Sequence, residues 1–333
     1  MTTKIIFGSN KLGELNESII EQMLERFHLG KFVSGERTNI GAMGQTMFIQ
    51  STKGEYVLKG NPLFPGQFEE ERFYIENLAQ KTMLALPTPY IIDFEEDLIG
   101  WSYVLMPRKK GTHLNEIQEQ LLVEGERQIV TEVAKVLAVM HQWKTPIFGE
   151  YQPVSAEIQP FASSYFQWLK ARILHWLEDA KKYSTITELD EQFTLDLIEQ
   201  AKSAFDSLKE AEFVMGDFKV GNFVVDKIDG QWKVSGIFDF TNAYFADGSN
   251  DLVKMFLYYI EKEKQSLVHE LFRVYVQLTQ KNREQMKNRL TIHMLHQRVL
   301  DWGCFKAMGA VTWDDNLSFS EWVQPYIAVI KEL

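Results

Sequence analysis

The sequence predicts an α+β protein in two lobes, a small β-rich N-terminal lobe and a larger, mostly helical C-terminal lobe. The chain has 333 residues, 45% of them hydrophobic, which is ample for a large buried core. Before residue 107 the apolar runs are short and broken by turn residues, whereas after it apolar residues recur at helical spacing over long stretches. We therefore expect one lobe over residues 1–107 and a second over residues 108–333.

The N-terminal lobe is expected to combine two helices with a set of strands. The first helix covers residues 16–29, because Asn16 or Ser18 can cap it and its apolar residues share one face. The second helix covers residues 67–80, and the Lys53-Gly54 pair predicts a hairpin turn between two strands. The expected strands are residues 31–34, 43–51, 55–59, 90–94 and 100–106.

Beyond a hinge near residues 106–110 the chain is expected to be mostly helical. Residues 213–240 interrupt this pattern with strands and turns, and Asp229-Gly230 within them is a strong hairpin signal. The expected helices are residues 128–143, 161–182 and 191–208, with more from residue 251 to the end.

Charge and composition exclude several classes of protein. The formal charge is −11, from 35 basic and 46 acidic residues. Such a chain is a poor nucleic-acid binder, since phosphate backbones need basic stripes, but it is compatible with a cationic substrate. No stretch approaches the roughly 20 apolar residues of a membrane span, and the N-terminus lacks a signal-peptide core. Cys304 is the single cysteine, so an internal disulfide is excluded and we expect a cytoplasmic protein. We further expect a monomer or a homodimer.

The most informative stretch, residues 213–240, holds three polar side chains at defined spacings. An apolar run leads into Gly216-Asp217, Asn222 follows after four intervening residues, and a second apolar run leads to Asp239. The predicted hairpin holds Asn222 and Asp239 at neighbouring strand ends that face one loop. A lone Asp217 is usually part of a turn or a cap, but this ordered set on one hairpin indicates a site.

These residue types suit phosphoryl transfer. The reaction needs a carboxylate that positions the acceptor hydroxyl and takes its proton, oxygen ligands for Mg²⁺, and a cation for the phosphates. Mg²⁺ prefers one or two protein oxygens together with phosphate oxygens and water, which an Asn and an Asp supply. The sequence thus predicts Asp217 as the base, with Asn222 and Asp239 as metal ligands.

The order of these residues resembles the aminoglycoside phosphotransferase family, which shares the protein-kinase-like fold. The resemblance lies in Gly-Asp-x-x-x-x-Asn from Gly216, in Ile-Phe-Asp-Phe ending at Phe240, and in Asp247 followed by Asp251-Leu252. It covers roughly residues 30 to 256 and implies a two-lobed small-molecule kinase. Three positions depart from the family pattern: Met215 where His is usual, Ala246 where Gly is usual, and Gly248 where Pro is usual.

The same resemblance implies a nucleotide site in the N-terminal lobe. Lys59 corresponds to the family's phosphate-binding lysine, although a strand-end lysine alone is more often solvated. In the following helix, family spacing selects Glu71 as the partner of that lysine, with Glu70 as its rival. The segment at Met106 resembles the hinge whose backbone meets the adenine. Gly41 and Gly44 lie in the loop between the first two strands: either they let the backbone approach the phosphates, or the loop is simply a flexible hairpin.

Several other residues have structural interpretations. Asp251 is expected to cap the following helix, and in the kinase-like fold an aspartate there also braces the catalytic loop. Asp247 is expected to have a structural role of the same kind, or else to face the substrate. His141 ends an apolar helix and is interpreted as structural, and Cys304 is expected to be buried and inert.

The sequence therefore predicts a kinase that transfers the γ-phosphate of ATP or GTP, with Mg²⁺, to a hydroxyl of a small molecule. The resemblance suggests an aminoglycoside or another amine or sugar as acceptor. The alternative is a pseudokinase that binds nucleotide without turnover, favoured by Met215. A protein kinase ranks last, because too few residues separate Asp239 from Asp251 for a peptide-docking segment. The acidic residues that can cradle an amine-rich acceptor are Asp247, Glu261, Glu263, Asp314 and Asp315.

Overall fold

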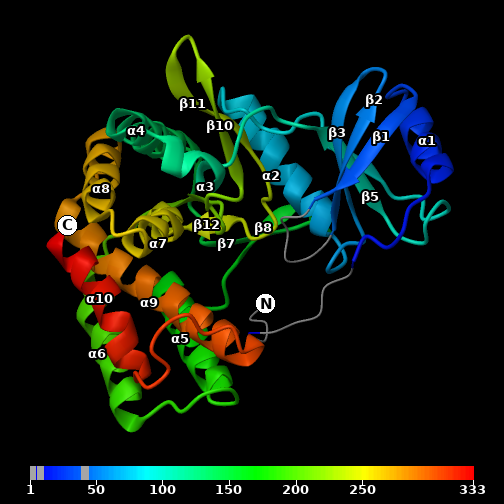
Figure 1. Ribbon diagram of the computed structural model, residues 1–333. Helices are drawn as coiled ribbons and strands as arrows, with labels where there is room; N and C mark the ends of the chain where they lie inside the picture. The colour runs from blue at the N-terminus through cyan, green and yellow to red at the C-terminus, as the bar shows by residue number, and fades with distance from the viewer. Residues whose placement is uncertain (1–4, 6–10, 39–44) are drawn as a thin grey trace.

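A computed structural model describes residue 5 and residues 11–38 and 45–333 of the chain. Within these residues the N-terminal part is built on an antiparallel sheet in the order β1-β2-β3-β5-β4, on the right of Figure 1. Its strands are β1 (Phe32–Arg37), β2 (Thr46–Ser51), β3 (Gly54–Gly60), β4 (Ile91–Asp93) and β5 (Tyr103–Pro107). Two helices accompany the sheet, α1 (Glu17–Arg26) and α2 (Gln67–Lys81).

The elements expected in this part form close to their predicted bounds. Asn16, rather than Ser18, caps α1 by accepting a backbone N–H at 2.9 Å. Strands β2 and β3 form the predicted hairpin, in which Ser51 pairs with Gly54. The turn therefore lies one residue earlier than the Lys53-Gly54 pair suggested, and Gly54 already belongs to the strand.

Two hydrophobic clusters fill the described part of the chain. The smaller cluster lies between α1 and the sheet and includes Met23, Leu24 and Leu58. The larger cluster fills the C-terminal part, yet it also takes in Phe68 and Tyr74 of α2. Because apolar burial is the main stabilising term, α2 is held by the larger cluster although it precedes residue 107. The division into residues 1–107 and 108–333 therefore stays a proposal.

The C-terminal part is mainly helical, as predicted (Figure 1). Its helices are α3 (Leu114–Ile117), α4 (Val123–Met140), α5 (Tyr165–Ala180), α6 (Glu188–Phe205), α7 (Val253–Glu261), α8 (Gln265–Thr279), α9 (Arg283–Met308) and α10 (Phe319–Glu332), with two 3₁₀ helices, η1 (Gln118–Gln120) and η2 (Gly248–Leu252). The long helix α9 packs against α5, α6 and α10, and α4 packs against α8. None of the described helices is long and apolar enough to cross a membrane.

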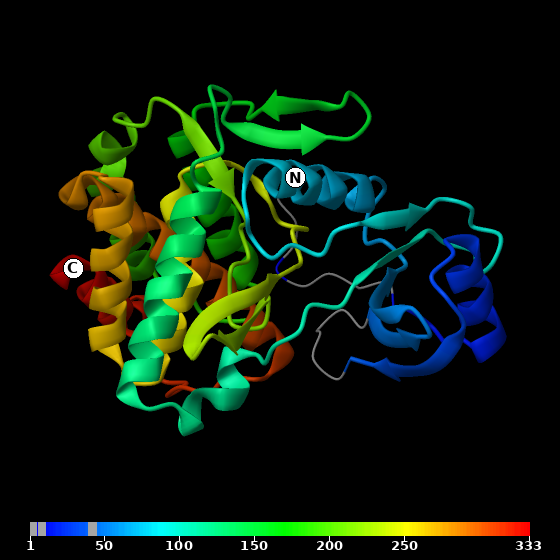
Figure 2. The same ribbon diagram turned by 90° about the horizontal axis from the view of Figure 1, so that it is seen from above.

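A second sheet, in the order β6-β9-β12-β7-β8, was for the most part not predicted. Its strands are β6 (Lys144–Thr145), β7 (Gly149–Gln152), β8 (Glu157–Pro160), β9 (Ala211–Val214) and β12 (Tyr244–Ala246). Strands of two to four residues are too short for a period of two to be recognised. The β7–β8 hairpin lies along α2 (Figure 2), where Tyr151 stacks on Phe73 at 3.7 Å and donates its N–H to Tyr74 Oη at 3.1 Å.

The hairpin predicted within residues 213–240 is formed by β10 (Phe223–Ile228) and β11 (Gln231–Ile237). Its turn residues Asp229 and Gly230 have φ of 52° and 77°, both in the left-handed region that a tight two-residue turn requires. At the open end of the hairpin, Phe238 N donates to Asn222 O at 3.0 Å. The start of one strand and the end of the other are therefore held side by side.

Candidate active site

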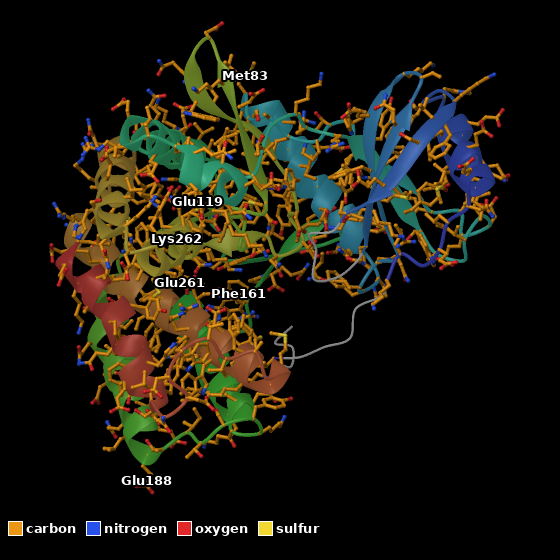
Figure 3. All side chains as sticks on the ribbon, viewed as in Figure 1. Met83, Glu119, Phe161, Glu188, Glu261 and Lys262 are labelled. Carbon is orange, nitrogen blue, oxygen red and sulfur yellow. The ribbon has the colours of Figure 1, made fainter. Side chains whose placement is uncertain are left out.

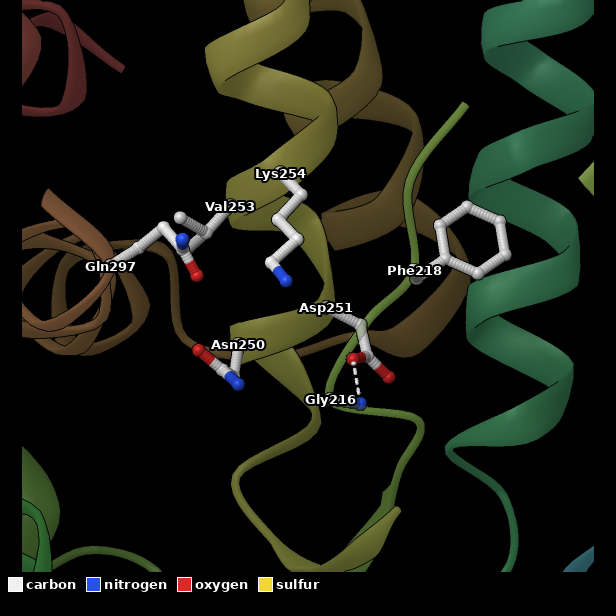
Figure 4. A pocket seen from close by; sticks show the side chains of 7 residues that line it. All are labelled: Gly216, Phe218, Asn250, Asp251, Val253, Lys254 and Gln297. Carbon is white, nitrogen blue, oxygen red and sulfur yellow. Dashed lines mark hydrogen bonds between the residues drawn. The ribbon is translucent and has the colours of Figure 1, made fainter. Parts of the chain in front are cut away.

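The loop between β9 and β10 carries Asp217, and its backbone is fixed at two points. Gly216 has φ of 76°, and a Cβ there would lie 2.2 Å from the Asn242 carbonyl oxygen, so a side chain does not fit. Asp251 accepts the backbone N–H groups of Met215 at 2.7 Å and Gly216 at 2.8 Å, the second of which Figure 4 shows. Asp251 thus braces this loop, as the kinase-like interpretation predicted.

Asp217 is almost fully buried and contacts three side chains. Asn222 Nδ2 donates to its main-chain oxygen at 2.8 Å and to its carboxylate Oδ2 at 2.9 Å. Lys219 Nζ lies 2.8 Å from Oδ2, and Lys254 Nζ, on α7, donates to Oδ1. Burial opposes the charge of Lys254, but Asp217 outweighs burial and raises the lysine's pKa above its ordinary value. The Asp217 carboxylate is therefore flanked by two cations.

Asn222 and Asp239 lie at neighbouring ends of the β10–β11 hairpin, as predicted. The side chain of Asp239 is 42% exposed, so its carboxylate remains open to solvent. Thr241 Oγ1 donates to Oδ1 of Asp239 at 2.8 Å, and Lys59 Nζ lies 3.4 Å from the same oxygen. The partial burial of Asp239 opposes its ionisation, but Lys59 and Thr241 outweigh this effect, so the pKa of Asp239 lies below its usual value. Its second oxygen, Oδ2, accepts no hydrogen bond from the described residues.

Lys59 reaches this group from β3 and is buried beside Glu71 of α2. Its Nζ donates to Glu71 Oε1 and, at 3.1 Å, to Thr241 Oγ1. Tyr90 Oη donates to Glu71 Oε2 at 2.7 Å, so both oxygens of that carboxylate are held. Burial alone would lower the pKa of Lys59, but Glu71 and Asp239 outweigh burial and raise it. Lys59 is therefore a cation at neutral pH, close to the end of the hairpin.

The ion pair also shows which of the two glutamates proposed as the partner of Lys59 takes that role. Glu71 makes the ion pair, as family spacing indicated. Glu70 is half-buried, and burial together with the carboxylates of Glu150 and Glu71 raises its pKa to about 8. A carboxyl group that is largely protonated near neutral pH is a weak partner for a cation, so the interpretation of Glu70 as the rival is wrong.

The other residues predicted for the nucleotide site are Met106, Gly41 and Gly44. Met106 is buried in β5 and pairs with Val57 of β3, directly before the chain leaves the N-terminal sheet. Its contact with an adenine ring stays a prediction. Gly41 and Gly44 lie outside the described residues.

Asp247 has the structural role predicted for it, and Asp251 has only one of its two. Asp247 caps η2 by accepting the Ser249 N–H at 3.2 Å. It is buried rather than facing a substrate: Arg289 Nε donates to its carboxylate at 2.9 Å, and His293 Nε2 lies 2.9 Å away. Burial opposes its charge, but Arg289 and His293 outweigh it and hold the pKa of Asp247 well below its usual value. Asp251 does not cap α7, because it lies inside η2 and α7 begins at Val253 without a side-chain cap.

Five acidic residues were predicted to cradle an amine-rich acceptor, and for all but the buried Asp247 this role stays a prediction. Glu261, labelled in Figure 3, lies at the end of α7 and pairs with Arg298 at 3.1 Å. Asp315 pairs with Lys306. Glu263 and Asp314 are exposed.

Two residues outside the reaction centre behave nearly as expected. His141 is buried between the Tyr275 hydroxyl at 2.6 Å and Asp251 at 3.2 Å, which confirms a structural role. Cys304 is half-buried rather than buried, and burial raises its pKa to about 11. Its thiol is therefore protonated at neutral pH and poorly nucleophilic.

Four residues of the site were not predicted: Thr241, Tyr90, Lys219 and Lys254. Thr241 and Lys219 each lie two positions beyond a predicted acid, so their spacing was the available signal. Tyr90 and Lys254 are separated along the chain from the groups they bind, and no local pattern identifies them.

The donor set fits a nucleotide with a magnesium ion. Among residues 5, 11–38 and 45–333, no three His, Cys, Asp or Glu side chains gather as a metal site. The side-chain oxygens of Asn222 and Asp239 suit an ion that takes most of its ligands from phosphates and water. Lys59 supplies a fixed positive charge for the phosphates.

The fold is α+β, and a lysine–glutamate pair from one part meets an aspartate at the end of a hairpin of the other part, beside an Asp–Asn loop. This arrangement defines a phosphotransferase of the protein-kinase-like type. The chain belongs to the phosphotransferase enzyme family, whose model matches residues 35–287, about three quarters of its length. It is therefore a small-molecule phosphotransferase that uses a hydroxyl group as acceptor.

Solved structures share the fold. A candidate aminoglycoside phosphotransferase from Ralstonia eutropha JMP134 has a TM-score of 0.66 at 17% identity, covering 96% of this chain and 98% of that one. A thermostable mutant of aminoglycoside phosphotransferase APH(4)-Ia, solved with ADP and hygromycin B, has a TM-score of 0.61 at 17% identity, with 94% and 98% covered. The GDP complex of aminoglycoside 2'-phosphotransferase-IIIa has a TM-score of 0.59 at 14% identity, with 96% and 98% covered.

At these identities the likeness establishes the fold. No curated protein matches the sequence. The comparisons give no support to the pseudokinase alternative, and Lys59, Asp217, Asn222 and Asp239 are all present and held by ion pairs or hydrogen bonds.

Proposed function

We propose that this protein transfers the γ-phosphate of ATP or GTP to a hydroxyl of a small molecule, with Mg²⁺ held at Asn222 and Asp239. The observation that carries the proposal is the approach of Lys59 Nζ to Asp239 Oδ1, at 3.4 Å across 180 positions of the chain. A buried lysine and an exposed carboxylate oxygen then face the same space from two parts of the fold. Structural relatives were solved with ADP or GDP, so either nucleotide is compatible.

The proposed roles follow from the contacts. The acceptor hydroxyl approaches Asp217, whose carboxylate accepts its proton as the acceptor oxygen bonds to the γ-phosphorus. The bond from the γ-phosphorus to the β–γ bridging oxygen breaks, and the nucleoside diphosphate leaves. Lys59, kept charged by Glu71, fixes the phosphates. Asn222 and Asp239 would hold Mg²⁺, which would offset the charge of the phosphates. Positioning and charge stabilisation then supply most of the rate enhancement.

A coupled assay for nucleoside diphosphate release tests the function. The panel contains aminoglycosides, macrolides, neutral sugars, sugar acids and amino alcohols, each with ATP and with GTP. We expect release above the background of nucleotide hydrolysis with one acceptor class. The Asp217→Asn variant should lose roughly 100-fold or more in turnover while binding nucleotide within about threefold of the wild type, because only the proton acceptor is removed.

Asp226→Asn is the matched control, because Asp226 lies on the same hairpin and its side chain is exposed. Its turnover should equal that of the wild type. Unchanged turnover in Asp217→Asn would remove Asp217 from the catalytic role. The cytoplasmic location inferred from the sequence stays a prediction.

A further inference from the structure

Lys254 contacts the proposed base from outside the loop that carries it. Its Nζ donates to Asp217 Oδ1, and its side chain is 25% exposed. The other two side chains that contact the Asp217 carboxylate, Lys219 and Asn222, belong to the same short segment as the aspartate. They move with the loop when it moves. Lys254, by contrast, holds the carboxylate relative to the helical part of the fold.

The helix that carries Lys254 is a firm support. Val253, Met255 and Phe256 of α7 are buried in the larger hydrophobic cluster. The helix also packs against η2, α8 and α9. Because protein interiors are closely packed, a helix held in this way has little freedom to shift. Lys254 lies in the first turn of α7, so the ammonium group extends from a fixed backbone.

The same segment also fixes the backbone of the loop. Asp251 lies three positions before Lys254, where η2 leads into α7, and residues three apart are neighbours on one helix face (Figure 4). Asp251 accepts the N–H groups of Met215 and Gly216, and Lys254 binds the side chain of the next residue, Asp217. The junction of η2 and α7 therefore holds three consecutive residues of the catalytic loop.

Neighbouring carboxylates keep Lys254 charged. Burial opposes its charge, but Asp217, followed by Asp301 and Asp251, outweighs burial and raises the pKa of Lys254 above its usual value. Lys254 is therefore a cation at neutral pH. Because Asp301 and Asp251 also offset its positive charge, the contact with Asp217 serves to hold the base and not to attract an anion.

The hydrogen bonds at Asp217 distinguish its two carboxylate oxygens. An ionised carboxylate offers about two acceptor sites on each oxygen. At Oδ2 both sites are engaged, by Asn222 Nδ2 at 2.9 Å and by Lys219 Nζ at 2.8 Å. At Oδ1 the described residues supply Lys254 alone. Oδ1 thus keeps a site for the hydroxyl of the acceptor, beside the ammonium group of Lys254.

We propose that Lys254 is a positioning residue for phosphoryl transfer, which orients Asp217 so that Oδ1 receives the proton of the acceptor hydroxyl. The proposal rests on the proposed function and adds a residue to its machinery. Without Lys254 the carboxylate can turn about its side-chain bonds, and the hydroxyl no longer meets an oxygen at a fixed place. A misplacement of about 1 Å can cost roughly 100-fold in rate.

Steady-state kinetics of Lys254→Met test the positioning role. We expect kcat to fall roughly 10- to 100-fold, while the KM for the nucleotide stays within about threefold, because the substitution leaves Lys59, Asn222 and Asp239 in place. Lys254→Arg should recover at least about threefold of the lost kcat, because a guanidinium group keeps a charged donor. A role in stability alone would lower the unfolding temperature without this loss in kcat.

Lys262→Met is the matched control. Lys262, labelled in Figure 3, is an exposed lysine directly after α7. Its substitution removes the same charge from the same helix without touching the catalytic loop. Both kinetic constants of this variant should equal those of the wild type.

A double-mutant cycle tests the contact without any acceptor. Urea unfolding is measured for the wild type, Lys254→Met, Asp217→Ala and the double variant. We expect the two substitutions to be coupled by at least about fivefold in the folding equilibrium constant, as contacting residues are. The cycle of Lys262→Met with Asp217→Ala should show additive effects.

Three results overturn the proposal: a kcat of Lys254→Met within twofold of the wild type, a loss confined to the KM for the nucleotide, or additive effects of Lys254→Met and Asp217→Ala. The test also separates this inference from the kinase function. Turnover that depends on Asp217 but not on Lys254 would leave the kinase standing and remove the positioning role. If the wild type released no nucleoside diphosphate with any acceptor, the reaction would be removed, and the cycle would still decide whether Lys254 holds Asp217.

Discussion

Glu70 and Glu71 are adjacent on α2, yet their surroundings differ. Glu71 accepts hydrogen bonds from Lys59 and Tyr90, so both of its oxygens are engaged. Glu70 has burial and two neighbouring carboxylates instead, so its pKa rises to about 8. A position shift of one residue along a helix turns the side chain by 100°, which is enough to change the environment completely.

The raised pKa of Glu70 predicts a pH-dependent effect on stability. Its pKa is about 8 in the folded protein and near 4.5 when unfolded, so the group favours the folded state fully below pH 4.5. That contribution is lost as the pH rises from 4.5 to 8. Glu70→Gln should therefore stabilise the protein by about 1 to 2 kcal/mol at pH 8 and hardly at all at pH 4.5.

Thermal unfolding at the two pH values checks this difference, with Glu69→Gln from the same turn of α2 as the control. A gain for Glu70→Gln that is the same at both pH values would contradict the raised pKa.

Met215 shows why the departure from the family pattern is compatible with an ordered loop. Its side chain is buried in the larger hydrophobic cluster. The loop is fixed by the backbone N–H of the same residue, which donates to Asp251 at 2.7 Å. A side-chain donor is therefore not required at this position to hold the loop.

At the scale of elements, the β9–β10 loop depends on one glycine. Gly216→Ala would place a methyl group 2.2 Å from a carbonyl oxygen, on a backbone with φ of 76°. We expect a loss of roughly 2–4 kcal/mol in the free energy of unfolding, together with lower turnover, because the loop must move away from Asp251. Urea titration measures the stability, and the coupled assay measures the turnover.

Gly221→Ala, in the same loop, is the control. A Cβ at Gly221 meets no atom within 4 Å, and its φ lies outside the left-handed region. That variant should stay within about 0.5 kcal/mol of the wild type. Equal losses for the two variants would show that the loop does not depend on the backbone at Gly216.

For the whole molecule, the proposed nucleotide site lies where the two parts of the fold meet. Lys59 of β3 contacts Asp239 and Thr241 beyond β11, and Tyr74 of α2 contacts Tyr151 of β7. A ligand at Lys59 and Asp239 touches both parts. It should therefore stabilise the folded chain as a unit, by about 2.7 kcal/mol at a hundred times its dissociation constant.

This predicts a rise of a few degrees in the unfolding temperature with ATP and Mg²⁺ together. ATP with EDTA should give a smaller rise, because the metal site is then empty. In Asp239→Ala the dependence on Mg²⁺ should disappear, which differential scanning fluorimetry can measure. If Asp239→Ala kept the full Mg²⁺-dependent rise, Asp239 would not be a metal ligand.

Much of the reaction centre follows from local sequence. Asp217, Asn222 and Asp239 lie within one short segment, and Asp229-Gly230 allows a single tight turn between the strands. Turn chemistry and alternation act over a few residues, so the neighbouring placement of Asn222 and Asp239 could be predicted. The long amphipathic helices could be predicted for the same reason.

The remaining features of the fold and the site depend on contacts between residues far apart in the sequence and on burial. Neither can be recognised in a single sequence. The short strands of the second sheet form because β12 pairs with β9 and also with β7, where Phe245 lies opposite Gly149, far away in the sequence. Lys254 reaches Asp217 only because α7 packs beside the catalytic loop. Asp247 points inward because Arg289 and His293 of α9 bind its carboxylate there. Local residue pattern thus sets which groups can do chemistry, while packing over distance sets the charges that surround them.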